Sequence, residues 1–89
     1  MRIIPIGGEV PQVVTMRQAR VALENNDLLD GINTHLNNKQ GKEGNLARIE
    51  WEYAQEVRRD SGLVQQIKNE LGWSDDQLDA LFKQASQIE

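Results

Sequence analysis

The sequence predicts an all-α protein, a small bundle of about five short helices that follows an extended N-terminal arm. Apolar residues recur at helical spacing over residues 15–89, and residues that favour helix caps stand before several of these stretches. Both prolines of the chain, by contrast, lie within residues 1–14. We therefore divide the 89 residues into an arm, residues 1–14, and a single helical domain, residues 15–89.

The predicted arm combines residue types that oppose helix formation. Pro5 and Pro11 lack a backbone N–H, the pair Gly7-Gly8 forms a hinge, and the other apolar residues are mostly β-branched. A lone strand leaves its backbone groups unpaired, so we expect the arm either to lie over its own domain or to pair with another chain. The candidate partner-binding residues are its apolar side chains Ile3, Ile4, Ile6, Val10, Val13 and Val14.

Two helices are expected next, followed by a loop. Thr15 and Gln18 fit a capping box, which predicts a helix over residues 16–25. Asp27 is placed to cap a second helix, whose apolar face holds Leu28, Leu29, Ile32 and Leu36. The stretch 37–45 is polar and contains two glycines, so it predicts an exposed loop.

A third helix is expected over residues 46–59, where Arg48 can pair with Glu52 one turn later. Its apolar stripe comprises Leu46, Ile49, Tyr53 and Val57, and the stripe is widened on one side by Ala47, Trp51 and Ala54. Trp51 is expected to lie in the core, as aromatic residues at helical spacing usually do. The alternative is that residues 51–53 and the first helix form an exposed surface for a partner.

Two more helices complete the prediction. Asp60 or Ser61 caps the first of them, which contains Leu63, Val64, Ile67 and Leu71 and ends at Gly72 in the left-handed conformation. Ser74 and Gln77 form a second capping box before the last helix, whose apolar face holds Leu78, Leu81, Phe82 and Ala85. Trp73 is expected to fill the joint between these two helices.

The composition excludes several classes of protein. Ten Lys and Arg against fourteen Asp and Glu give a net charge of −4, which argues against a nucleic-acid binder because such proteins neutralise phosphates with excess basic residues. The absence of Cys excludes disulfides, zinc ribbons, iron–sulfur sites and thiol catalysis. No apolar run is long enough for a membrane span or a signal peptide, so we expect no membrane partner and synthesis in the cytoplasm.

No residue pattern predicts a catalytic, cofactor-binding or metal site. His35 is the single His and has neither Cys nor carboxylates at ligand spacing. Glu52, Glu56 and Asp60 would share one helix face, but arginines lie among them, so we interpret this face as a solvated surface. We therefore expect no enzyme activity, no cofactor, no metal and no small-molecule substrate.

Four segments of the chain carry a family resemblance. They are residues 11–20 (PQVVTMRQAR), 49–54 (IEWEYA), 59–64 (RDSGLV) and 71–82 (LGWSDDQLDALF). Together, over residues 11–85, the chain resembles a family of small helical proteins of tailed bacteriophages and prophages, whose genes typically lie beside tail-fibre and tail-tip genes. The same module also occurs fused to fibre-like proteins. The resemblance implies a setting and brings no catalytic residues with it.

The resemblance leads to one expected function and two alternatives. We expect a virion component of the tail, tail tip or fibre attachment region, assembled in the host cytoplasm in several copies, which grips other tail or fibre proteins through its arm. The first alternative is a tail-fibre assembly chaperone that is absent from mature virions. The second is a host-directed regulator or acidic DNA mimic, which depends on the net charge of −5 over residues 50–89.

Overall fold

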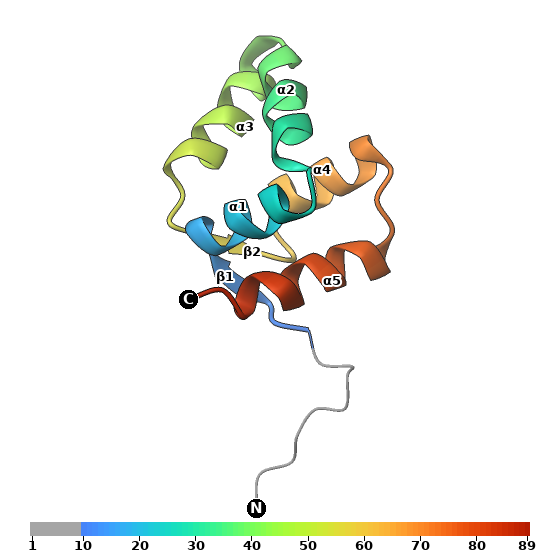
Figure 1. Ribbon diagram of the computed structural model, residues 1–89. Helices are drawn as coiled ribbons and strands as arrows, with labels where there is room; N and C mark the ends of the chain where they lie inside the picture. The colour runs from blue at the N-terminus through green and yellow to red at the C-terminus, as the bar shows by residue number, and fades with distance from the viewer. Residues whose placement is uncertain (1–9) are drawn as a thin grey trace, which may run out of the picture.

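The computed structural model describes residues 10–89 (Figure 1). Over this range the chain forms five helices and one two-stranded sheet, so the protein is mainly α and the prediction of an all-α fold is corrected. In chain order the elements are β1 (Val13–Thr15), α1 (Met16–Asn25), α2 (Leu29–Asn38), α3 (Gly41–Tyr53), β2 (Glu56–Arg58), α4 (Gly62–Leu71) and α5 (Asp75–Ser86).

The end of the predicted arm belongs to the folded domain. β1 pairs with β2 in antiparallel register, with Val14 opposite Val57. Two further backbone hydrogen bonds extend the pairing, from Arg59 N–H to the Gln12 carbonyl and from Met16 N–H to the Gln55 carbonyl, each at 2.9 Å. Of the two expected alternatives, the last residues of the arm therefore follow the first: they pair with their own domain, and their backbone groups find partners within the same chain.

The predicted third helix is wrong at both of its ends. It begins at Gly41, inside the predicted loop, because Gly44 packs directly on the preceding segment: a Cβ there would lie 2.6 Å from the Lys39 carbonyl oxygen. It ends at Tyr53, and residues 56–58 form β2 instead of its last turn. Arg48 reinforces the close approach of α2 and α3 by donating to the carbonyls of Leu36 at 2.6 Å and Lys39 at 2.7 Å.

Most of the predicted caps are confirmed. Thr15 and Gln18 form both bonds of the capping box of α1, and the Ser61 hydroxyl caps α4 by accepting from Val64 N–H. The Ser74 hydroxyl accepts from Gln77 N–H, which is one half of the second predicted box. Gly72 ends α4 with φ +74, in the left-handed region, as predicted.

The predicted cap at Asp27 is wrong. Its backbone is left-handed, with φ +59, and the N-cap position of α2 falls on Leu28, which has no side-chain cap. The left-handed turn moves the start of α2 one residue along the chain, beyond the reach of an Asp27 cap.

The core consists of two adjoining clusters of buried side chains. One contains Met16, Leu23, Ile32, Leu36, Ala47, Trp51, Leu63, Ile67 and Leu81, and the other contains Val14, Ala22, Val64, Leu78, Phe82 and Ala85. Trp73, in the joint between α4 and α5, is half-buried and packs against both clusters, in agreement with its predicted place. The indole N–H of Trp51 donates to Asn33 Oδ1 at 3.0 Å and so ties α3 to α2.

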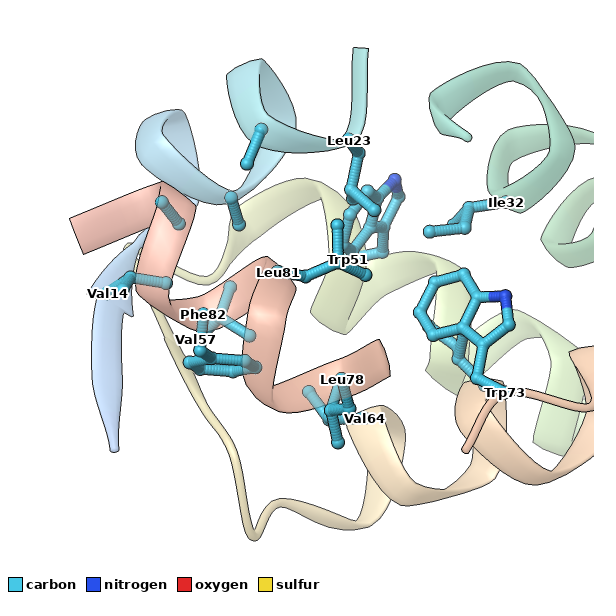
Figure 2. Close-up of a pocket in the computed structure, with 14 residues that line it drawn as sticks. Val14, Leu23, Ile32, Trp51, Val57, Val64, Trp73, Leu78, Leu81 and Phe82 are labelled. Carbon is cyan, nitrogen blue, oxygen red and sulfur yellow. The ribbon is translucent and has the colours of Figure 1, made fainter. Parts of the chain in front are cut away.

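A small cavity of about 50 Å³ lies where these clusters meet (Figure 2). Only apolar side chains line it, and they come from all five described helices or their joints and from both strands. Ligand pockets are usually several hundred Å³, so this cavity is a packing gap of the core rather than a binding site. None of the described helices is both long enough and apolar enough to cross a bilayer.

Candidate interaction surface

The structure disperses the predicted partner-binding residues of the arm. Ile3, Ile4 and Ile6 lie outside the described residues. Val14 is only 4% exposed and packs in the core of its own chain, so it is not available to a partner. The other two predicted residues are more exposed than Val14. Val10 is half-buried against the second core cluster, and Val13 is 38% exposed.

A different apolar surface lies on α3. Leu46, Ile49 and Tyr53 belong to the predicted apolar stripe, and they are 56%, 53% and 74% exposed. α3 instead buries the neighbouring stripe of Gly44, Ala47 and Trp51. Because the helix ends before Val57, the predicted stripe loses its last member, and the side with Trp51 packs inward.

The exposed stripe is compact and continuous. At 100° per residue, its three side chains span about 60° of the helix circumference and about 10 Å of its length. Three of the four large hydrophobic side chains exposed among residues 10–89 belong to it, the fourth being Val13 on β1. Clustered exposure of this kind is typical of interaction sites, whereas single exposed apolar residues are ordinary.

Glutamates border the stripe on both sides, and the exposed Lys42 lies in line with it one turn before Leu46. By helical geometry Glu43 and Glu50 lie along one edge and Glu52 along the other, and all three are exposed. We call the three apolar residues and these three glutamates the α3 face. Arg48, predicted to pair with Glu52, donates instead to the carbonyls at the end of α2, and this leaves Glu52 without an ion pair among the described residues.

Two hollows adjoin the α3 face where α3 meets α4. The smaller, about 170 Å³, is lined by Glu43, Leu46, Ala47, Glu50, Leu63 and Gln66. The larger, about 340 Å³, continues toward β2 and includes Met16, Ala54, Val57 and Arg58 in its lining. Glu50 and Leu63 line both hollows, and Leu46 is the member of the apolar stripe that lines the smaller one.

The other charged clusters hold elements of the fold together. His35 Nε2 and Lys39 Nζ contact the carboxylate of Glu70 at 2.6 and 2.9 Å, which joins the end of α2 to α4. Hydrogen bonds from Lys39 and then from His35 lower the pKa of Glu70 to about 2. This arrangement places the single His in a hydrogen-bond network that joins two helices.

A second network links the turn before α4 to α5. Arg59 contacts Asp79 at 2.5 Å and Asp75 at 3.7 Å, and Lys68 contacts Asp75 at 2.8 Å. The hydrogen bond from Lys68 lowers the pKa of the Asp75 carboxyl. Asp75 and Asp79 are thus paired within the chain and hold α5 to the turn before α4 and to α4. Over residues 10–89, no group of three His, Cys, Asp or Glu is arranged to hold a metal ion.

Comparison of the chain with protein-family models, curated proteins and solved structures found no match. The case for function therefore depends on the residues of this chain and on the surface that they form. Sequence reasoning offered residues 51–53 as an alternative partner surface but did not single out Leu46 and Ile49, because the two apolar stripes of α3 are adjacent. The signal that distinguishes them is the pair of small residues, Gly44 and Ala47, which together with Trp51 permit close packing on the inner side.

Proposed function

We propose that the protein is a non-enzymatic virion component of a tailed bacteriophage, a small adaptor in the tail, tail tip or fibre attachment region. The tail setting rests on the resemblance noted in the sequence of residues 11–85, and the comparisons with known proteins found no family that bears on it. The adaptor role is supported by one observation above all, the exposed stripe of Leu46, Ile49 and Tyr53 beside the hollows between α3 and α4. When a partner covers such a surface, apolar area is removed from water, and this favours association.

The surface that binds the partner differs in part from the expected one. Because Val13–Thr15 pair with β2 and Val14 is buried, these residues serve the fold first. In this proposal the α3 face is the principal contact, and Ile3, Ile4 and Ile6 form a second contact with a neighbouring tail or fibre chain. Several copies are placed around the symmetry axis of the tail.

Mass spectrometry of purified particles tests the proposal. The protein is quantified against the major tail protein of the phage or prophage that encodes it, in particles separated from lysate by a density gradient. A fixed stoichiometric ratio is the expected result, and this ratio indicates the symmetry of the position that the protein occupies in the particle. Absence from particles, with abundant protein in the lysate, would overturn the virion assignment in favour of the assembly chaperone.

Deletion of residues 1–9 then separates the two proposed contacts. This deletion leaves β1 and Val14 in place, whereas deletion of residues 1–14 removes both and damages the core. Reduced incorporation of a folded protein that lacks residues 1–9 would support the second contact. Incorporation at the level of the intact chain would leave the α3 face as the contact and overturn the role of the arm.

A further inference from the structure

We infer that the α3 face binds a basic amphipathic helix of a different protein, in which an apolar stripe is flanked by Lys and Arg. The inference rests on the proposed adaptor function and names the chemistry of the partner. Three properties of the α3 face support it: its shape, its charge and its symmetry.

The shape suits a helix of about two turns. Leu46, Ile49 and Tyr53 follow i, i+3, i+7 spacing, so they form a ridge whose length is close to two helical turns. The hollow lined by Leu46 and Leu63 adjoins the first residue of this ridge. A partner helix can pack its own apolar ridge against the exposed one, which is a common mode of helix packing and of peptide recognition.

The charge of the border selects a basic partner. Glu50 and Glu52 have no ion pair within residues 10–89, and Glu43 accepts only a hydrogen bond from Gln66, at 3.2 Å. Carboxylates at the rim of an interface attract Lys and Arg and repel acidic partners. The glutamates therefore contribute mainly to the choice of partner, while the apolar stripe provides the buried area.

The symmetry of the border opposes a second copy of this chain. In an antiparallel two-fold pairing of α3, the edge with Glu43 and Glu50 meets the same edge of the other copy. In a parallel two-fold pairing, that edge meets the edge with Glu52. Both arrangements bring carboxylates against carboxylates, which disfavours association. The same feature that attracts a basic helix thus keeps the chain from covering its own apolar stripe.

A pair of designed peptides provides the direct test. One is an amphipathic helix with leucines at i, i+3, i+4 and i+7 and lysines on both flanks, and the other has every lysine replaced by glutamate. Binding to the intact chain is measured by calorimetry and by amide chemical shifts in NMR spectra. We expect the basic peptide to bind at least about tenfold more tightly and to perturb the amides of α3.

Matched variants exclude a general attraction between opposite charges. Glu50→Lys with Glu52→Lys reverses the border, whereas Glu24→Lys with Glu89→Lys makes the same change of net charge at exposed positions elsewhere. We expect the first pair to weaken binding of the basic peptide by about tenfold or more and the second pair to change it far less. Equal effects of both pairs, or equal binding of both peptides, would overturn the inference.

Self-association and particle incorporation complete the test. Sedimentation of the intact chain should show a monomer, and a dimer that Ile49→Ser with Tyr53→Ser dissociates would contradict the inference in favour of a second copy. If the wild-type chain is present in particles and the border-reversed variant enters them equally well, the inference fails while the proposed function stands. If the wild-type chain is absent from particles, the virion assignment fails, whatever the peptides show.

Discussion

Val14 lies opposite Val57 in the antiparallel pairing of β1 with β2, and both side chains line the cavity at the centre of the core. Through this pair the residues before the first helix become part of the hydrophobic core. Val14 is 4% exposed and its neighbour Val13 is 38% exposed, as expected for the alternating sides of a strand. The contrast between these two valines leads to the first prediction.

We expect Val14→Ala to destabilise the protein by about 2 kcal/mol, because it removes two buried methyl groups and enlarges the cavity. Val13→Ala is the matched control on the same strand and should change the free energy of unfolding by less than about 0.5 kcal/mol. Urea denaturation followed by circular dichroism measures both. Similar losses for the two variants would show that the side chains are not divided between the core and the surface.

The two tryptophans should differ in their contribution to stability. Trp51 is buried and hydrogen-bonded to Asn33, so Trp51→Ala should cost about 3–5 kcal/mol in a protein of this size. Trp73 is half-buried, and Trp73→Ala should cost clearly less. Thermal and urea unfolding of the two variants provide the comparison. A smaller loss for Trp51→Ala than for Trp73→Ala would contradict the described packing of α3.

Two glycines should respond to alanine in opposite directions. At Gly44 a Cβ would lie 2.6 Å from the Lys39 carbonyl oxygen, so Gly44→Ala forces α2 and α3 apart and should cost about 1–3 kcal/mol. At Gly31, which is exposed within α2, no atom lies within 4 Å of the added Cβ. Gly31→Ala should therefore stabilise the protein by about 0.5–1 kcal/mol. Melting temperatures that shift in the same direction for both variants would refute this account of the α2–α3 contact.

The network around Glu70 predicts a pH dependence of stability. Its carboxyl has a pKa of about 2 in the folded protein, lowered from 4.5 by Lys39 and His35. Because the folded pKa lies below the unfolded one, the stabilisation is complete above about pH 4.5 and is lost as the pH falls toward 2. Glu70→Gln should therefore be less stable than the wild type at pH 6, and the difference should shrink on acidification.

High salt should also reduce the difference between wild type and Glu70→Gln, since Glu70 is exposed and its ion pairs are screened. Denaturant titrations at pH 6 and pH 3 measure the effect of pH. Repeating them in about 0.5 M NaCl, which screens exposed charges strongly, measures the effect of salt. A difference that is unchanged by pH would indicate that the carboxylate does not contribute through its charge. Glu24→Gln, at an exposed residue outside this network, serves as the control.

The elements that could be predicted from the sequence are those specified by local signals. The caps Thr15, Ser61 and Ser74 and the left-handed Gly72 depend on interactions within four residues, and the structure contains each of them. The apolar faces of α1, α4 and α5 were likewise predicted from spacing alone, and most of their members are buried. The prediction of a mainly helical protein follows from these elements.

The errors arise where distant segments decide the local structure. Residues 56–58 continue a helical pattern, but they pair with β1, which lies some forty residues earlier in the chain. The composition of residues 37–45 predicts a loop that contains Gly44, whereas Gly44 lies in α3 and lets two helices approach closely. The choice between the two stripes of α3 has the same origin, because it depends on which side the rest of the molecule covers.

Residues near both ends of the described chain pack on the same side of the domain. Val10 and Ile88 both pack against the second core cluster, and Gln18 Nε2 donates to the Ile88 carbonyl at 2.9 Å. In Figure 1 the C-terminus lies beside β1, while the turn between α2 and α3 lies at the opposite end of the domain. A polypeptide that carries this domain as an insertion would thus enter and leave on the same side of it, with the turn between α2 and α3 on the far side.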